Sequence, residues 1–218
     1  MNIIWHGQSF FEISTKDINN KELKIVIDPF DKNIGLKLPK VEAQILLITH
    51  NHSDHSNKKA IGGNPFLIEG PGEYETKGIY IKGVLGFHDN SQGEERGKVV
   101  FYIIEVENMK ICHLSDIGQR ELTSEQIEQI GDVDILMIPV GGVYTLDAKQ
   151  ASSIISQIEP KMVIPMHYQV PKLNLKLNSL DQFLKEIGSP NIEPQRKFKV
   201  KMSDIPKEIM QTIVFEVY

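Results

Sequence analysis

Four side chains that can bind metal lie within six consecutive residues, directly after an aliphatic run. The run is Ile45 to Thr49, and the cluster is His50, His52, Asp54 and His55. Three imidazoles and a carboxylate would be costly to bury at a strand end without partners, so a bound divalent cation is the simplest explanation. Alternate residues of an extended segment project to the same side, so His50 and His52 are expected to bind one ion. Asp54 and His55, after the turn, are expected to reach a second.

The types of ligand narrow the choice of metal. Imidazole and carboxylate groups without cysteine suit zinc, manganese or iron. A single histidine is usually a surface residue or a hydrogen-bonded core residue. A solvated loop, however, gives no reason for three histidines in one turn, so the metal interpretation is preferred for the cluster as a whole.

Three further candidate ligands follow apolar, strand-like runs elsewhere in the chain. They are His88 after residues 78–85, Asp116 after residues 110–114, and His167 after residues 161–165. Taken alone, Asp116 has a helix cap as its less favoured alternative interpretation. The ends of strands at one edge of a sheet converge, so the seven side chains together predict a single metal-lined edge.

The elements that must position these residues are mostly strands in the first half of the chain. Short apolar or alternating runs predict strands over 2–5, 10–14, 23–27, 66–68 and 99–106, with a tight turn at 70–74. Capping residues and apolar spacing predict helices over 123–130, from Asp147 to Ile158, and over 179–187. A closing strand is expected over 212–218. Helices between buried strands indicate a layered sandwich in which helices cover the sheets.

Composition indicates one globular domain over residues 1–218, with 40% hydrophobic residues and a net charge of −5. The mild acidity argues against nucleic acid and anionic membranes as partners, and a small-molecule substrate is expected. The single cysteine, Cys112, offers no disulfide framework, and the start of the chain has no secretion signal. No run reaches the roughly 20 apolar residues that span a bilayer. We therefore expect a cytoplasmic protein, and homo-oligomerisation remains open.

The cluster resembles a known signature. The segment His50-Asn51-His52-Ser53-Asp54-His55 is similar to the H-x-H-x-D-H motif of metallo-β-lactamase superfamily hydrolases, and the three later ligands follow in that superfamily's order. The resemblance extends over essentially the whole chain. Four shorter segments further resemble the branch that includes ascorbate-6-phosphate lactonase-like enzymes: Gly7-Gln8-Ser9, Leu114-Ser115-Asp116-Ile117-Gly118, Pro139-Val140-Gly141-Gly142 and Pro165-Met166-His167-Tyr168.

The resemblance implies an α+β fold, a four-layer αβ/βα sandwich, with the site at the edge of the two sheets. It implies that one metal is held by His50, His52 and His88, and the other by Asp54, His55 and His167. Asp116 would bridge the two ions. Two positions depart from the family pattern: Gln8 stands where relatives often have histidine, and Ser115 replaces the glycine usual before the bridging aspartate.

The expected function is hydrolysis of a small, anionic ester or lactone by a metal-bound hydroxide, with two zinc or manganese ions and iron as an alternative. Two cations about 3.5–4 Å apart can lower the pKa of a shared water. Asp54 and Asp116 are the expected catalytic residues, and Asp54 would hold the hydroxide in line. A phosphodiesterase or nuclease of the same superfamily is the first alternative, although no basic arm for nucleic acid is evident. A non-catalytic metal-binding protein is the second.

Several nearby residues have no assigned role. His113 lies three residues before Asp116, and strand alternation favours a supporting role rather than ligation. Tyr168 is either a substrate contact or an ordinary half-buried tyrosine. Arg96 and Lys98 either bind an anionic group of the substrate or belong to a solvated hairpin loop, and the second interpretation is preferred.

Overall fold

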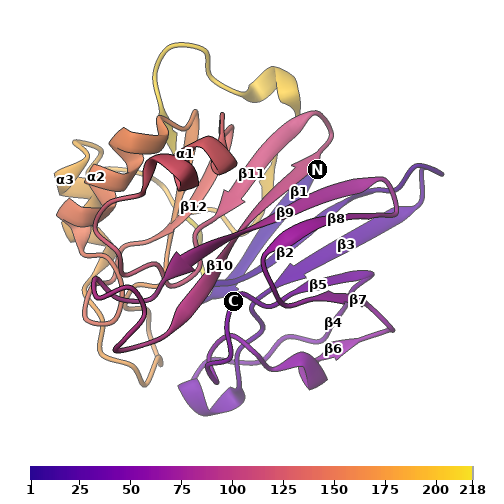
Figure 1. The fold of residues 1–218 in the computed structure, drawn as a ribbon, viewed down its shortest axis with the longest axis horizontal. Coiled ribbons are helices and arrows are strands. Elements are labelled where there is room, and N and C mark those ends of the chain that lie inside the picture. Colours follow the sequence, from indigo (N-terminus) through magenta and orange to yellow (C-terminus); the bar gives the residue numbers. More distant parts are fainter. Residues whose placement is uncertain (218) are drawn as a thin grey trace.

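The computed structural model describes residues 1–217, which form two β-sheets packed against each other (Figure 1). One sheet has the order β14-β1-β2-β3-β5-β7, with β14 (Phe198–Lys199), β1 (Asn2–Gly7), β2 (Phe10–Lys16), β3 (Glu22–Ile27), β5 (Ile45–Leu47) and β7 (Phe66–Ile68). The other has the order β15-β13-β12-β11-β10-β9-β8, with β15 (Gln211–Thr212), β13 (Met162–Met166), β12 (Ile135–Pro139), β11 (Met109–His113), β10 (Lys98–Val106), β9 (Ile79–Phe87) and β8 (Gly72–Thr76). A separate small pair joins β4 (Val41–Glu42) to β6 (Ile61–Gly62).

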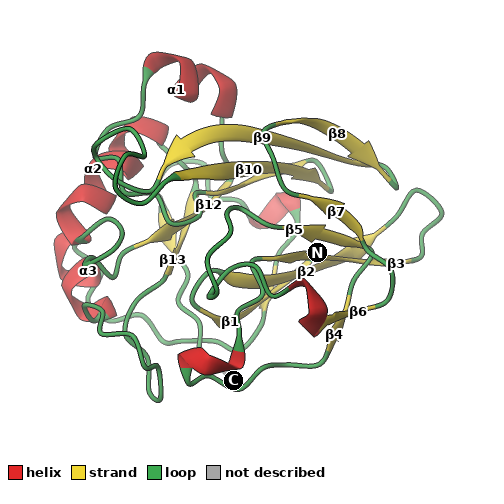
Figure 2. Ribbon diagram, turned by 60° about the horizontal axis from the view of Figure 1, so that its bottom comes forward, coloured by secondary structure: helices red, strands yellow, loops and turns green. Residues whose placement is uncertain are grey.

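The three α-helices of the described residues all follow the main run of strands. They are α1 (Ser124–Ile130), α2 (Ala148–Ile158) and α3 (Leu180–Glu186), and Figure 2 shows them together on one side of the molecule. Thr123 and Asp147 begin α1 and α2 with capping boxes, in which the side chain at the N-cap and a glutamine three residues later exchange hydrogen bonds with the backbone. The predicted α+β sandwich is confirmed, with short 3-10 turns at Lys32–Ile34, Lys58–Ala60 and Met202–Asp204.

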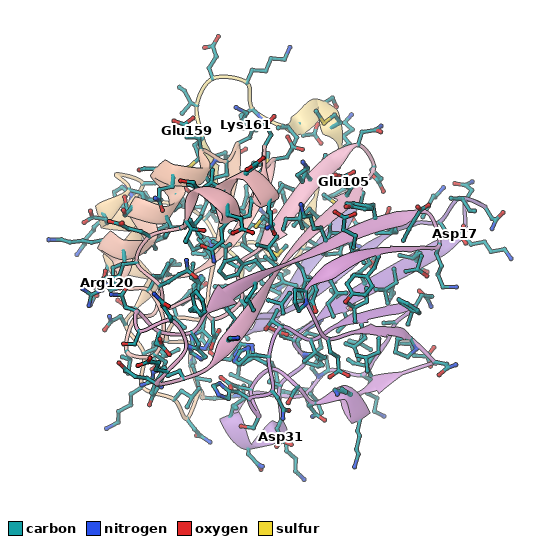
Figure 3. All side chains as sticks on the ribbon, viewed as in Figure 1. Asp17, Asp31, Glu105, Arg120, Glu159 and Lys161 are labelled. Carbon is teal, nitrogen blue, oxygen red and sulfur yellow. The ribbon has the colours of Figure 1, made fainter. Side chains whose placement is uncertain are left out.

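The core lies between the sheets and beneath the helices. Every residue of β12 and β13 is buried, as expected for parallel strands covered on both faces, and α2 is the connection between these two strands. Charged side chains such as Asp17, Arg120 and Lys161 lie at the outside of the molecule (Figure 3). The described residues contain no helix with the length and apolarity needed to cross a membrane.

Strand direction explains how distant parts of the chain meet. β11, β12 and β13 are parallel, while β10 is antiparallel to both β9 and β11. β9, β11 and β13 therefore run the same way and end at the same edge of their sheet. His88 directly follows β9, His167 directly follows β13, and Asp116 lies three residues beyond β11. The predicted convergence of strand ends is thus a consequence of the sheet topology.

Two predicted elements were wrong. The turn predicted at 70–74 becomes the edge strand β8 from Gly72 onward, because its backbone pairs with β9 from Gly72↔Gly83 to Thr76↔Ile79. The closing strand predicted over 212–218 is reduced to Gln211–Thr212, because the following residues leave the sheet and Phe215 forms an isolated bridge with Gln195. The last position of that prediction, 218, lies outside the described residues.

Candidate metal centre

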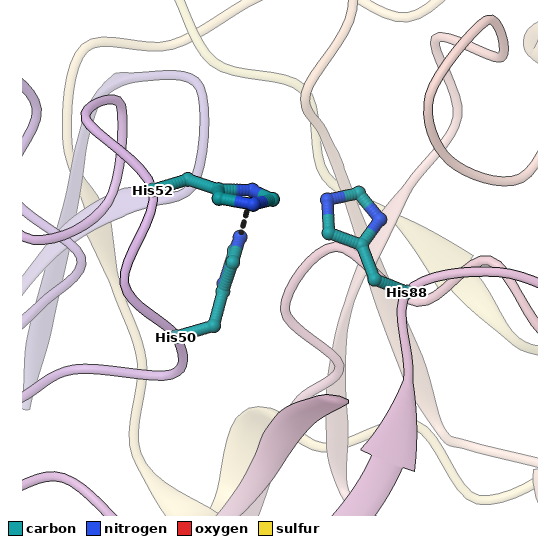
Figure 4. Close-up of side chains that lie close together, drawn as sticks. All are labelled: His50, His52 and His88. Atoms are coloured by element: carbon teal, nitrogen blue, oxygen red, sulfur yellow. Dashed lines mark hydrogen bonds between the residues drawn. The ribbon is translucent and has the colours of Figure 1, made fainter. Parts of the chain in front are cut away.

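Three of the seven predicted ligands form a histidine group. Nε2 of His50 lies 3.0 Å from Nδ1 of His52, and the ring of His88 faces both from the other sheet, with centroid distances of 5.1 Å to each (Figure 4). One nitrogen of each ring lies within 4.8 Å of the other two, so all three can reach one cation. Three imidazoles with space for a further ligand are typical of a catalytic zinc site rather than a closed structural one.

The other four ligands form a second group. Nε2 of His55 lies 3.4 Å from Oδ2 of Asp54 and 3.0 Å from Oδ2 of Asp116. Nε2 of His167 lies 3.7 Å and 3.2 Å from the same two oxygens. Ligands about 2.0–2.2 Å from a tetrahedral cation are about 3.3–3.6 Å apart, so these four atoms surround a space of the right size for a zinc-sized ion.

Hydrogen bonding supports the same conclusion. Nε2 of His55 is buried and has no hydrogen-bond partner among residues 1–217, although Oδ2 of Asp116 is only 3.0 Å away. Such an arrangement is expected where the lone pairs of the two atoms, Nε2 of His55 and Oδ2 of Asp116, point at one position between them that a cation can occupy. The residues present therefore fit a divalent cation.

Asp116 lies between the two groups. Its Oδ2 is 3.0 Å from His55, 3.2 Å from His167 and 3.6 Å from Nε2 of His88, which belongs to the histidine group. Ser9 Oγ donates a hydrogen bond to the other carboxylate oxygen at 3.2 Å, which fixes the orientation of the side chain. Asp116 is the residue that the family resemblance implies as a bridging carboxylate.

Asp28 is a member of the site that the sequence did not reveal. It is fully buried, and its Oδ2 accepts hydrogen bonds from His55 Nδ1 at 2.8 Å and Thr49 Oγ1 at 2.6 Å. It also lies within metal-binding distance of His50 and His55. In the neutral form of His55, with Nδ1 donating to Asp28, Nε2 is the acceptor and faces the cluster. Asp28 directly follows β3, the same signal that identified the other candidate ligands, and is followed by Pro29, a residue typical of the end of a strand.

Four buried residues at the site have left-handed backbone conformations, with φ between 48° and 54°: Gln8, Asp28, Ser115 and His167. Such conformations are strained for residues other than glycine and persist where the surroundings fix them. Ser115 has a conformation that glycine adopts without strain, which agrees with the glycine that the family resemblance implies at this position. Its hydroxyl compensates in part by donating to Thr49 Oγ1 at 2.7 Å, which joins the loop after β11 to the strand end before His50.

Gln8 reaches the second group of ligands. Its Nε2 lies 3.1 Å from Nε2 of His167 and donates to Oδ2 of Asp54 at 3.3 Å, while its Oε1 is buried without a hydrogen-bond partner among the described residues. The backbone oxygen of Gln8 accepts from the indole of Trp5 and from the backbone of His167. Gln8, at the position where the family resemblance implies a histidine, therefore contacts two of the predicted ligands directly.

Charge in the cluster favours ionised carboxylates. Burial opposes ionisation of Asp116, but the positive charges of His167 and His55 outweigh it and hold the pKa of this carboxyl well below its usual range. Burial, together with the charge of His55, lowers the pKa of His50 to about 2. Burial also lowers the pKa of His167, but Asp116 and Asp54 overcome this and raise it to about 9. Ionised aspartates and a neutral His50 are the forms that bind cations, and a cation in the second group would displace the protons that give His55 and His167 their charge.

The cluster forms the floor of a cavity of about 160 Å³. Its lining residues are His52, Asp54, His88, Arg96, Asp116, Tyr144, His167 and Leu175. Arg96 lines this cavity although its side chain is also exposed, as expected for a solvated hairpin loop, whereas Lys98 does not line the cavity. Access from this cavity to both ligand groups means that a small molecule can approach any cation held there.

The remaining candidates lie outside the cavity. His113 is buried; its Nε2 lies 3.1 Å from the backbone oxygen of Ser9, and its Nδ1 accepts from the backbone of Ser115 at 3.1 Å. It thus contacts Ser9, which donates a hydrogen bond to Asp116, and Ser115, which precedes Asp116 in the chain. Tyr168 packs against Trp5 with ring centroids 4.9 Å apart, so it belongs to the core.

Comparison with known proteins agrees with this geometry. A family model described as a beta-lactamase superfamily domain matches residues 2–167. A UPF0173 metal-dependent hydrolase from Thermoplasma volcanium is 32% identical over 197 residues, which cover 76% of this chain and 82% of the relative. Another, from Lawsonia intracellularis, is 28% identical and covers 95% of this chain and 98% of the relative. A solved structure from Thermotoga maritima, described as a Zn-dependent hydrolase of the metallo-beta-lactamase superfamily, has 33% identity and a TM-score of 0.77, covering 98% and 97% of the two chains.

The fold and the site thus define a metal-dependent hydrolase of the metallo-β-lactamase type. Within that class, the chain belongs to the UPF0173 metal-dependent hydrolase family.

Proposed function

We propose that this protein hydrolyses a small, anionic ester or lactone with two divalent cations, zinc or manganese, as in the ascorbate-6-phosphate lactonase-like branch. The observation that carries the proposal is the position of Asp116, whose Oδ2 lies within 3.6 Å of a histidine of each ligand group. A carboxylate shared in this way is typical of a two-metal site. The Thermotoga maritima relative, described as Zn-dependent, supports zinc.

The cations, when bound, would supply the Lewis acidity that activates water at neutral pH and polarises the substrate carbonyl. The protein supplies positioning. Asp54 lines the cavity, and its side chain is 17% exposed, the most exposed of the four residues in the second group. Burial opposes its ionisation, but the charge of His55 and a hydrogen bond from His167 keep its pKa well below the usual range. An ionised Asp54 can accept a hydrogen bond from an attacking water and hold that water in line.

The size and charge of the cavity support a small anionic substrate. A volume of about 160 Å³ suits a small molecule rather than a polymer, and Arg96 contributes a permanent positive charge to its wall. A cytoplasmic location is proposed on separate grounds, because Cys112 is a free thiol buried in the core.

A panel of lactones, phosphodiesters and thioesters, assayed with metal-loaded and chelated protein, tests the proposal. Hydrolysis of lactones or esters that is lost on chelation and restored by zinc or manganese is expected. Full activity in a metal-free sample would exclude the metal mechanism. Faster hydrolysis of phosphodiesters would instead favour the phosphodiesterase alternative, since a two-metal centre suits attack at phosphorus equally well.

A further inference from the structure

Arg96 and Tyr144 form one wall of the cavity. The guanidinium carbon of Arg96 lies 5.0 Å from the centre of the Tyr144 ring, which is a cation–π distance. Both residues line the cavity together with His52, His88 and other predicted ligands. Arg96 comes from the loop between β9 and β10, and Tyr144 from the loop between β12 and α2. Two separate loops therefore bring a fixed positive charge beside the metal centre.

The loop that carries Arg96 is held by one buried carboxylate. Asp89, which directly follows the ligand His88, accepts hydrogen bonds from four backbone N–H groups, those of Ser91, Gly93, Glu95 and Arg96, at 2.8 to 3.1 Å. The backbone of His88 in turn donates to Gly97 at 3.0 Å. The position of Arg96 is consequently coupled to that of His88, and ordering this loop requires no substrate.

The guanidinium of Arg96 has N–H groups available to bind a ligand. In the part of the chain that the structure describes, no carboxylate forms an ion pair with Arg96, and the neighbouring Glu95 accepts instead from Ser91. Stacking on a ring uses the face of the guanidinium and leaves its N–H groups pointing outward at the edge. Among the residues that line the cavity it is the only one with a permanent positive charge. An unpaired arginine with an open edge favours a phosphate or a carboxylate, which it can bind through two hydrogen bonds.

We propose that Arg96, supported by Tyr144, is an anion-binding subsite that holds a phosphate or carboxylate group of the substrate away from the bond that is hydrolysed. This inference rests on the proposed esterase or lactonase function. It names the substrate class as small esters or lactones that carry a second, anionic group. Discrimination between anionic and neutral substrates then comes from Arg96, whereas the hydrolytic step depends on the ligand cluster.

The kinetic test compares esters that differ in charge but not in size. Three 4-nitrophenyl esters serve, those of valeric acid (neutral), glutaric acid (carboxylate) and 3-phosphonopropanoic acid (phosphonate). In the Arg96→Gln variant, KM for the two anionic esters should rise about 10- to 100-fold, as expected for loss of a charge-assisted hydrogen bond. KM for the neutral ester should change less than about twofold, and Arg96→Lys should recover part of the loss. The relative effects on glutarate and phosphonate show which anion the subsite prefers.

Lys98→Gln is the matched control, because it removes the same charge two residues away from a side chain that does not line the cavity. It should leave all three KM values unchanged. The subsite is refuted if Arg96→Gln changes KM equally for the neutral and the anionic esters. It is also refuted if Arg96→Gln and Lys98→Gln change KM equally.

A binding measurement separates failure of the subsite from failure of the proposed function. Inorganic phosphate should raise the melting temperature of the chelated wild-type protein and of Lys98→Gln more than that of Arg96→Gln. If no ester is hydrolysed but this difference is found, the subsite stands and the hydrolytic function falls. If phosphate stabilises all three proteins equally, the subsite is refuted whatever the activity.

Discussion

The carboxylate of Asp28 lies 2.8 Å from Nδ1 of His55, and neither side chain has any exposed surface. A buried carboxylate that accepts from one imidazole nitrogen orients the ring and makes the other nitrogen a better ligand. The same carboxylate accepts from the backbone N–H of Thr49 at 2.8 Å, so it also holds the strand end before His50. One side chain thus positions members of both ligand groups.

Asp28→Asn should weaken metal binding without removing a predicted ligand. The amide can still accept from Thr49, but it lacks the negative charge that supports His55, so affinity for zinc should fall roughly 10- to 100-fold. Titration calorimetry with the metal measures this. Asp147→Asn is the control, since asparagine also caps a helix and Asp147 begins α2 away from the cluster. Unchanged affinity in Asp28→Asn would show that Asp28 has only a structural role.

Removing one ligand from each group should change the metal content differently. His52 belongs only to the histidine group, so His52→Ala should reduce the bound zinc from about two ions per chain to about one. Asp116→Asn should weaken both sites, because its carboxylate lies between them. Hydrolysis should fall at least roughly 100-fold in each variant.

Elemental analysis after gel filtration gives the stoichiometry. His6→Gln is a suitable control because His6 is a buried histidine outside the ligand groups, packed against Phe10. If the wild-type protein binds one ion per chain, the two-metal proposal is contradicted. If that single ion is still bound in His52→Ala, it lies in the second group of ligands.

The close approach of Gly118 to His88 suggests a test of how the backbone positions a ligand. A Cβ atom at Gly118 would overlap the carbonyl group of His88, so Gly118→Ala requires the backbone after β9 or β11 to move. We expect a loss of about 1–3 kcal/mol of stability and weaker metal binding, because His88 and Asp116 lie on the two segments that must separate. Urea unfolding and metal titration measure the two effects. Gly70→Ala is the control, since its Cβ would make only an ordinary contact with Tyr74.

The candidate ligands could be selected from the sequence because their signals are local. The H-x-H-x-D-H segment specifies four ligands by itself, and His88, Asp116 and His167 each follow an apolar strand that the sequence shows clearly. Their convergence follows from the direction of β9, β11 and β13. The same rule would have found Asp28 after β3, had the adjoining proline not suggested a simple end of the strand.

Other features depended on contacts that the sequence does not record. The place of Arg96 follows from the four backbone groups gathered by Asp89, which no pattern of residue types predicts. β8 was mistaken for a turn because Gly70, Pro71 and Gly72 are strong turn residues, whereas pairing with β9 decided the conformation. In β8 the pairing with a neighbouring strand outweighs local preference, whereas the loop after His88 depends on side-chain-to-backbone hydrogen bonds within the loop itself.

Acid sensitivity should depend in part on Glu12, which is buried in the sheet away from the metal centre. Its carboxylate lies 2.9 Å from Nζ of Lys24 and 3.5 Å from Nε2 of His6. The interaction with His6, together with Lys24 and against the effect of burial, lowers the pKa of Glu12 to about 2 from a usual value of 4.5. A carboxyl whose pKa is lower in the folded state stabilises the fold above pH 4.5, and this contribution is lost as the pH falls from 4.5 toward 2.

Glu12→Gln should therefore be less stable than the wild-type protein at pH 7, by about 1–3 kcal/mol, with the lower figure favoured because Lys24 is partly exposed. The difference should shrink as the pH falls below 4.5 and vanish near pH 2. Urea unfolding of both proteins with a chelator present, so that metal release does not contribute, measures the difference at each pH. Glu121→Gln, at an exposed position, should match the wild-type protein throughout. If the difference in the free energy of unfolding between Glu12→Gln and the wild-type protein stays constant with pH, the lower stability is due to packing and not to the charge of Glu12.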